Sequence, residues 1–229
     1  MTNELPLGQG VLVLSPPRCG SSCVTACISF QGFSLGKTPT DVQDVYNAKG
    51  YFENRRVLEF NRAALRRVRT PIYTSTPLSN DQANRTMAQQ QELKELLAEE
   101  FGSCSRFVIK DPRIVLLRRL YLSLLPEVKI VCLTRSREAA ANSMTNIDQK
   151  STRVRRFLPV WDCYMSECEK LKDELGDRVY SLKFEEFLED PIAKTKELCS
   201  FLSVPFLPEN GEAVLDFIDP KLVRYGKDV

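Results

Sequence analysis

The chain carries Val11-Leu12-Val13-Leu14-Ser15-Pro16-Pro17-Arg18-Cys19-Gly20-Ser21-Ser22 near its start, an apolar run followed by a turn rich in proline, glycine and hydroxyl side chains. This pattern predicts a short buried strand, a turn and the beginning of a helix. The first N–H groups of a helix lack intrahelical partners and carry partial positive charge, so an anion placed there gains hydrogen-bond donors. The stretch therefore indicates a phosphate-binding loop, with an ordinary turn as the alternative.

The side chains of this turn suit the same task. Gly20 has no Cβ and lets the backbone approach an anion closely. We expect Ser21 and Ser22 to cap the helix and to supply hydroxyl donors. Arg18 adds a guanidinium fork that matches phosphate or sulfate oxygens.

The loop departs from the Walker A pattern of ATP and GTP binders. That pattern needs a second glycine and a lysine before the hydroxyl residue, and Ser21 stands where the lysine belongs. The order Arg18-Cys19-Gly20-Ser21-Ser22 instead resembles the 5′-phosphosulfate loop of sulfotransferases. The resemblance implies that Arg18, Cys19, Gly20, Ser21 and Ser22 bind the 5′-phosphosulfate of 3′-phosphoadenosine 5′-phosphosulfate (PAPS).

A second segment matches the other end of that nucleotide. Residues 128–134 form a predicted buried strand, and the following residues 135–143 open an Ala-rich helix in which Ser136 is the expected N-cap. Arg135 and Ser143 resemble the pair that binds the 3′-phosphate in sulfotransferases. Eight residues of helix rise about 12 Å, which a long arginine side chain can partly span. Without the resemblance, both would be ordinary surface side chains.

A third match lies between these two. Residues 106–110 form a short β-prone run that ends at Lys110 and is followed by Asp111-Pro112-Arg113. The resemblance implies that Lys110 stabilises the negative charge that develops on the bridging oxygen as the sulfuryl group leaves. Arg113 is expected to bind either the sulfuryl group or an acidic neighbour.

The C-terminal third adds a fourth match without a catalytic group. Residues 178–191 read as a strand and an acidic turn, and Asp190-Pro191 predicts the start of a helix that runs towards residue 202. The resemblance spans residues 11–205 and implies an α/β fold of the P-loop NTPase type, with a mainly parallel sheet flanked by helices. The ligand is then expected at the C-terminal ends of the strands.

The general base is the open question, because the chain contains no histidine. Many cytosolic sulfotransferases use a histidine for this step, whereas relatives that act on sugars use a carboxylate. Glu53 occupies the comparable region and is the first candidate; Asp111 is the second. The alternative for Glu53 is a structural acid before a helix that begins at Asn54.

Composition sets wider limits. A chain of 229 residues with 43% hydrophobic residues predicts one sulfotransferase-like domain over residues 1–229. The net charge of +2 is spread along the chain, so nucleic acid is not an expected partner. The N-terminus resembles no signal peptide and no apolar stretch is long enough to span a membrane, so a cytoplasmic protein is expected.

The eight cysteines include no Cys-x-x-Cys pair and, without histidine, predict no metal site. Most are expected to be small buried hydrophobic residues. Cys19 is the exception, because a helix N-terminus can lower the pKa of a thiol.

These observations predict in-line sulfuryl transfer from PAPS, without a metal, to a hydroxyl or amine of a small-molecule or glycan acceptor. A non-catalytic sulfonucleotide-binding protein and a small-molecule P-loop kinase are the alternatives. The polar stretch 70–80 is expected to cover the acceptor pocket. The sequence does not identify the acceptor, the oligomeric state, or the roles of the basic stretches 153–156 and 224–227.

Overall fold

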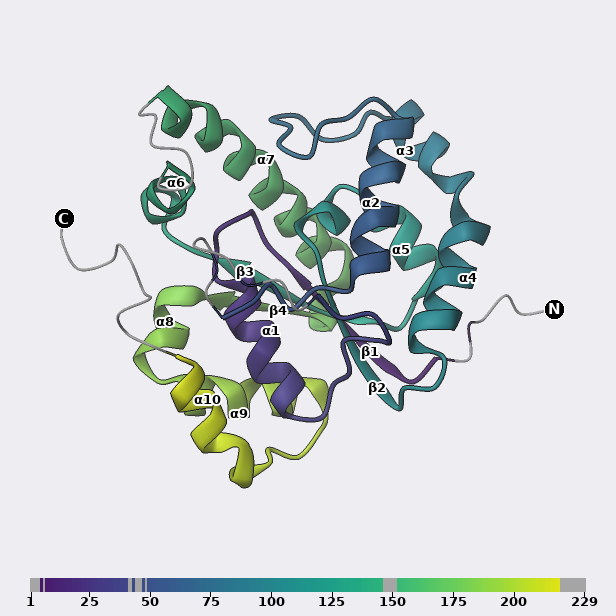
Figure 1. Ribbon diagram of the computed structural model, residues 1–229. Helices are drawn as coiled ribbons and strands as arrows, with labels where there is room; N and C mark the ends of the chain where they lie inside the picture. Colours follow the sequence, from purple (N-terminus) through teal and green to yellow (C-terminus); the bar gives the residue numbers. More distant parts are fainter. Residues whose placement is uncertain are drawn as a thin grey trace.

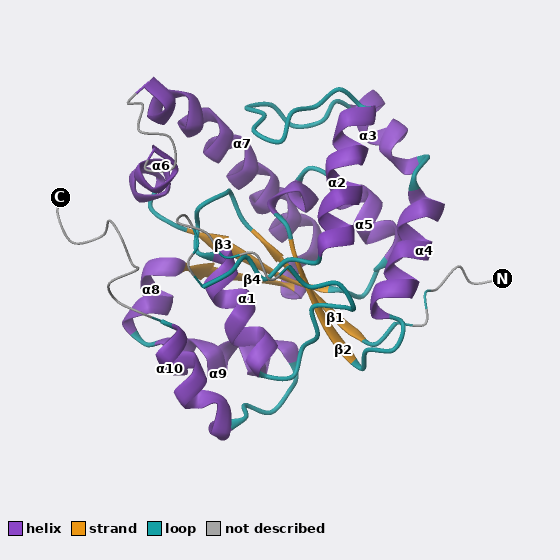
Figure 2. Ribbon diagram, in the orientation of Figure 1, coloured by secondary structure: helices purple, strands orange, loops and turns teal. Residues whose placement is uncertain are grey.

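The computed structural model describes residue 5, residues 7–40, residues 43 and 47, residues 49–145 and residues 152–218. In this part of the chain a four-stranded sheet with the order β2-β1-β3-β4 forms the centre of the molecule (Figures 1 and 2). The strands are β1 (Gln9–Leu14), β2 (Arg106–Lys110), β3 (Lys129–Thr134) and β4 (Val179–Lys183). Every pair in the sheet is parallel. The predicted α/β fold with a parallel sheet is confirmed.

The strands are apolar on both faces because helices cover both. Side chains alternate along β1, so Leu12 and Leu14 join one core while Val11 and Val13 join the other. In register, Leu12 lies opposite Ile109 of β2 and also opposite a residue of β3. β1 is therefore the central strand of two separate hydrophobic cores.

One core is formed with α2 (Arg55–Arg67), α4 (Gln90–Phe101), α5 (Arg118–Leu124) and α7 (Thr152–Leu175), and α3 (Asn80–Met87) packs beside α2 and α5. The other core is formed with α1 (Ser21–Phe30), α8 (Phe184–Glu189), α9 (Pro191–Leu202) and α10 (Gly211–Phe217). Helix α6 (Arg137–Thr145) follows β3 and packs against α7 (Figure 1). Short 3₁₀ helices span Pro112–Val115, Gly176–Arg178 and Pro208–Asn210.

Two local predictions are confirmed at helix starts. Asp190 caps α9, because its Oδ1 accepts from the N–H of Ala193 at 2.9 Å. Ser136 lies before α6, and its Oγ accepts from the N–H of Ala139 at 3.1 Å. None of the helices built from the described residues is long and apolar enough to cross a membrane.

Candidate functional site

Residues 15–20 connect β1 to α1 and form the loop that the sequence singles out. Gly20 is the N-cap of α1 and has a φ of 82°, in the left-handed region. A Cβ at this position would lie 2.3 Å from ring carbons of Phe184. Glycine is therefore needed here both for the backbone conformation and for the close approach of α8.

The prediction that Ser21 and Ser22 cap α1 is wrong. The helix has no side-chain cap, because Gly20 takes the N-cap position and both serines already belong to the first turn. The Oγ of Ser22 instead accepts from Nδ2 of Asn47 at 3.1 Å. Sequence reasoning missed Asn47, and no spacing signal connects it to the loop 25 residues earlier.

The expectation that Cys19 has a reactive thiol is also wrong. Cys19 is fully buried, and burial raises the pKa of its thiol to about 12, although Trp161 and Arg135 act in the opposite direction. Desolvation of a thiolate outweighs the modest gain from a helix N-terminus. Cys19 is therefore a protonated residue of the loop whose side chain lies in the hydrophobic core.

The loop after β1 meets the segment after β3. Nε of Arg18 donates to Oγ of Ser143 at 3.1 Å, and Nη1 of Arg135 donates to the carbonyl oxygen of Arg18 at 3.4 Å. Arg18 has a φ of 69°, a left-handed conformation that is uncommon for a residue with a Cβ. Two segments that the sequence predicts to bind anions, more than 100 residues apart, are thus in direct contact.

The guanidinium of Arg135 is desolvated in this arrangement. Its Cζ lies 5.6 Å from the centroid of the Phe184 ring, and burial lowers the pKa of Arg135, against opposing contributions from Cys19 and Glu185. A partly buried cation is stabilised by an anion within reach. The site therefore favours a negatively charged ligand.

Lys110 and Glu53 form a buried ion pair at the end of β2. Nζ of Lys110 lies 2.8 Å from Oε1 of Glu53, and the two residues are 4% and 8% exposed. Glu53 directly precedes Asn54, the N-cap of α2, so the expected helix start is confirmed. The structure brings together two residues that the sequence assigns to leaving-group stabilisation and proton transfer.

Asp111 lies in a separate buried network. Its Oδ1 accepts from the N–H of Arg113 at 2.9 Å and from Nε of Arg113 at 2.7 Å, while Oδ2 accepts from Nδ2 of Asn61 at 3.0 Å. The hydroxyl of Tyr121 in turn donates to Oδ1 of Asn61 at 2.8 Å. Of the two partners expected for Arg113, an acidic neighbour is the one it contacts.

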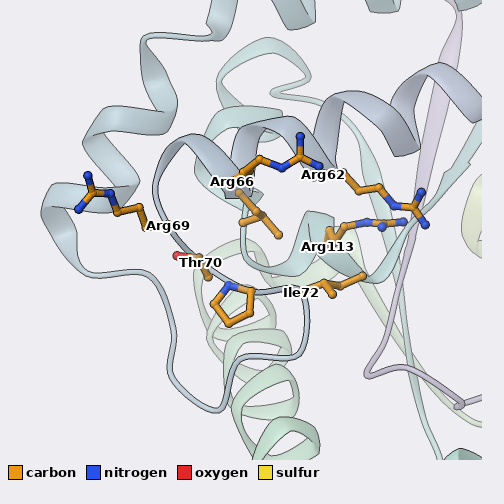
Figure 3. Close-up of a pocket in the computed structure, with 8 residues that line it drawn as sticks. Arg62, Arg66, Arg69, Thr70, Ile72 and Arg113 are labelled. Carbon is orange, nitrogen blue, oxygen red and sulfur yellow. The ribbon is translucent and has the colours of Figure 1, made fainter. Parts of the chain in front are cut away.

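Next to Arg113 lies a pocket of about 580 Å³ that sequence reasoning missed (Figure 3). We call it the arginine pocket; its lining residues are Arg62, Leu65, Arg66, Arg69, Thr70, Pro71, Ile72 and Arg113. Arg62 and Arg66 are four residues apart and therefore lie on one side of α2, and Arg69 lies just beyond the end of the helix. This spacing of arginines is the sequence pattern from which the pocket could have been predicted. Thr70, Pro71 and Ile72 come from the stretch that was expected to cover the acceptor pocket.

A family model for the sulfotransferase family matches residues 10–208, most of the chain. The chain belongs to the sulfotransferase family. No curated protein matches this sulfotransferase at a significant level.

Solved structures agree on the fold of this sulfotransferase. The sulfotransferase domain of the Synechococcus PCC 7002 olefin synthase is 18% identical, with a TM-score of 0.57 over 95% of this chain and 80% of that domain. A sulfotransferase from Alicyclobacillus acidocaldarius is 16% identical, with a TM-score of 0.55 over 93% and 87%. Retinol dehydratase, in a complex with retinol and 3′-phosphoadenosine 5′-phosphate (PAP), is 15% identical. Its TM-score is 0.50, over 94% of this chain and 66% of that protein.

Some expectations concern parts of the sulfotransferase outside this site. Arg156 is exposed on α7, whereas the side chains of Arg153 and Arg155 and the stretch 224–227 lie outside the described residues. Among the side chains that the structure describes, no three Cys, Asp or Glu residues are grouped so that they could hold a metal ion.

Proposed function

We propose that this sulfotransferase transfers the sulfuryl group of PAPS to a hydroxyl or amine of a small-molecule or glycan acceptor. The observation that carries the proposal is the contact of Arg18 with Ser143 and of Arg135 with the Arg18 carbonyl. These residues follow the neighbouring strands β1 and β3, and ligands of open parallel sheets bind at the C-terminal ends of the strands. The presence of PAP in the retinol dehydratase complex supports a nucleotide of this kind.

The residues present fit the nucleotide. Helix α1 begins directly after Gly20 of the loop, and the first N–H groups of a helix lack intrahelical partners, so they can donate to a phosphosulfate. The desolvated guanidinium of Arg135 suits a second anionic group. Arg18 lies two residues before Gly20 and contacts both Ser143 and Arg135.

Bound PAPS would supply a sulfuryl group. As the acceptor atom bonds to sulfur, the S–O bond to the phosphate would break and its electron pair would stay on the phosphate oxygen. Lys110 carries the positive charge that would stabilise that oxygen. Glu53 would take the proton that the acceptor loses. Because the two groups are ion-paired at 2.8 Å, proton acceptor and charge stabiliser are held within one hydrogen bond of each other.

Asp111 has a positioning role in this proposal rather than that of a base. Both of its oxygens already accept hydrogen bonds, from Arg113 and Asn61, and the residue is only 1% exposed. Removing a proton from an acceptor would require it to give up one of these buried bonds. Its network instead fixes the orientation of Arg113.

Calorimetric titration with PAP, adenosine 5′-phosphosulfate and ATP with Mg²⁺ tests the proposal. We expect micromolar binding of PAP, at least tenfold weaker binding of adenosine 5′-phosphosulfate, and loss of PAP binding in Arg135→Ala. Preference for ATP with Mg²⁺ would favour the kinase alternative, and no nucleotide binding would contradict the proposal. PAP binding without turnover of PAPS over a broad panel of hydroxyl and amine acceptors would favour a binding protein.

A further inference from the structure

The arginine pocket is strongly cationic. Four of its eight lining residues are arginines, and none is acidic. Figure 3 shows Arg62 and Arg66 on α2, above the segment that carries Thr70 and Ile72. Arg113 lies between the helix and this segment. The other lining residues are Leu65, Pro71 and Ile72, which are apolar, and Thr70, which carries a hydroxyl.

The arginines of this pocket differ from three other arginines on α2 and the adjacent α3. Arg56 is ion-paired with Glu99 and Glu100 and Arg67 with Glu92, all on α4, whereas Arg85 is ion-paired with Asp81 within α3. Within the described part of the chain, Arg62, Arg66 and Arg69 make no ion pair and no side-chain hydrogen bond. Like charges four residues apart, as in Arg62 and Arg66, destabilise a helix.

The helix dipole does not account for this cluster. A cation in the last turn of a helix is favourable, and this explains Arg66 near the C-terminus of α2. Arg62 lies a full turn earlier, and Arg113 belongs to a different segment. An anionic ligand accounts for all of them together.

Arg113 supplies an independent observation. Its side chain is almost completely buried, and although its Nε is bound to Asp111, its Nη1 is buried with no hydrogen-bond partner among the described residues. A buried charged donor without a partner is costly, and native proteins rarely keep one without a reason. A ligand oxygen in the pocket would satisfy it.

The pocket lies on the acceptor side of the proposed reaction centre. The proposed nucleotide contacts follow β1 and β3. Lys110 ends β2 and Arg113 follows it, and β2 lies on the opposite side of β1 from β3. Arg113 is three residues beyond Lys110 and is close enough to Glu53 for the two charges to interact. An acceptor group bound beside Arg113 would therefore lie near Glu53.

We propose that the arginine pocket binds an anionic group of the acceptor, a carboxylate, phosphate or sulfate attached to a partly apolar skeleton. This inference rests on the proposed function, because it assigns the substrate class of the same site. Guanidinium groups bind such oxygens through paired hydrogen bonds, and Leu65, Pro71 and Ile72 would contact the carbon skeleton. The acceptor is therefore an acidic hydroxyl or amino compound rather than a neutral one.

The test uses the protein saturated with PAP, so that the nucleotide site is filled, and matched probes. One probe is 5-hydroxyisophthalate, which has one hydroxyl and two carboxylates on a ring; its neutral diamide is the control, and citrate is an anion of different shape. Binding is measured by calorimetry for wild type, for Arg62→Ala/Arg66→Ala and for Arg119→Ala. Arg119 is exposed on α5 and does not line the pocket, so it serves as the control for loss of a positive charge outside the pocket.

We expect at least one anion to bind, the diamide to bind at least tenfold more weakly than the dicarboxylate, and the double variant to lose at least tenfold in anion affinity. Arg119→Ala should match wild type, and PAP affinity should be the same in all three proteins. Failure of both anions to bind, equal affinity for acid and amide, or undiminished anion binding in the double variant would overturn the inference. PAP binding is measured first and separately, so its absence identifies failure of the proposed function instead.

Discussion

Gly20 combines a left-handed backbone with a close contact to Phe184, so the site tolerates no side chain there. Gly20→Ala should destabilise the protein by about 3 kcal/mol, through strain and overpacking, and lower the Tm by about 6–12 °C. PAP affinity should fall as well, because α8 must move. The measurement is thermal unfolding together with PAP titration.

The matched control for that substitution is Gly176→Ala. Gly176 also has a positive φ, of 54°, but a Cβ there would meet nothing within 4 Å. Only the backbone strain remains, which costs about 1 kcal/mol. Equal effects of the two substitutions would show that the Phe184 contact is unimportant.

Substitution of Glu53 tests whether this carboxylate is the proton acceptor of the proposed reaction. Glu53→Gln keeps the shape but removes the proton acceptor, so turnover of an acceptor should fall at least about 100-fold while PAP affinity changes less than about threefold. Steady-state kinetics and calorimetry measure the two effects. Glu59→Gln, at an exposed position on α2, is the control.

The Glu53 substitution also leaves Lys110 buried without its ion-pair partner. That loss should cost about 3 kcal/mol of stability, so kinetics must be measured well below the Tm. Unchanged turnover in a folded Glu53→Gln protein would remove Glu53 from the mechanism and return Asp111 to consideration as the base.

At this scale the sequence predicts residue types better than residue environments. The resemblance singled out Arg18, Arg135 and Ser143, and the structure places them in contact. The Cys19 thiol was mispredicted because a local rule about helix ends contains no information on burial. Likewise, nothing in the sequence near Asp111 reveals its bond to Asn61, 50 residues away.

Among the elements, the start of α2 depends on a buried acid. Asn54 caps the helix and also donates to Oε2 of Glu100 at 2.7 Å, and Thr38 donates to the same oxygen through its N–H and its hydroxyl. Burial would raise the pKa of Glu100, but these hydrogen bonds and Arg56 outweigh it and hold the pKa below its ordinary value. The carboxylate thus joins α4 to the entrance of α2.

The lowered pKa of Glu100 predicts that the folded state loses stability at acidic pH. A depressed pKa contributes stability that is present above the ordinary value of 4.5 and is lost as pH falls below it. Between pH 6 and pH 3.5 the Tm of wild type should therefore fall more steeply than that of Glu100→Gln. Thermal melts over this range measure it, with the exposed Glu99→Gln as control; parallel curves would contradict the expectation.

Most boundaries of helices and strands follow local sequence patterns and could therefore be predicted. Apolar or β-prone runs predicted β1, β2 and β3, and the family resemblance predicted the strand that forms β4. Asp190-Pro191 and Ser136 marked helix starts because capping depends on neighbouring residues. The start of α1 was misassigned, since the left-handed conformation of Gly20 shifts the N-cap away from the serines. Conformation at one glycine is set by its contact with α8, which local sequence does not encode.

For the whole molecule, one of the two cores contains a thiol and phenols that stay protonated to higher pH in the folded chain than in the unfolded chain. Burial raises the pKa of Cys19 to about 12, and burial likewise raises the pKa of Tyr121 and Tyr164. A raised pKa gives stability that is complete below the ordinary values of 9.0 for the thiol and 10.0 for the phenols and is lost as pH rises above them. The fold should therefore be sensitive to alkali.

Urea unfolding at pH 8 and pH 10.5 measures this sensitivity. Each such group costs about 1.4 kcal/mol per pH unit above its ordinary pKa, so the midpoint should fall markedly while the slope m stays constant. Tyr121→Phe should begin less stable, by about 1 kcal/mol, because Asn61 loses its donor, and should lose less on raising the pH. Equal losses in both proteins would rule out a contribution from Tyr121.

Strand order is the feature of the whole molecule that residue patterns do not reveal. Apolar runs mark β1, β2, β3 and β4, but the order β2-β1-β3-β4 arises from how the connecting helices pack on the two faces. The family resemblance predicted the parallel sheet. Because β2, β1 and β3 are neighbours in that sheet, their C-terminal ends lie side by side, and the proposed site residues lie at these ends. The arginine pocket depends on the same arrangement, since Arg113 reaches it from after β2.

The central place of β1 also has a consequence for how the chain is made. Both neighbours of β1 are encoded far downstream, and β2 begins roughly 90 residues after β1 ends. At about 5–20 residues per second, a ribosome exposes β1 several seconds before either partner strand emerges. During translation this apolar strand is an unpaired edge, so nascent chains stalled before residue 106 should bind chaperones that longer chains no longer need.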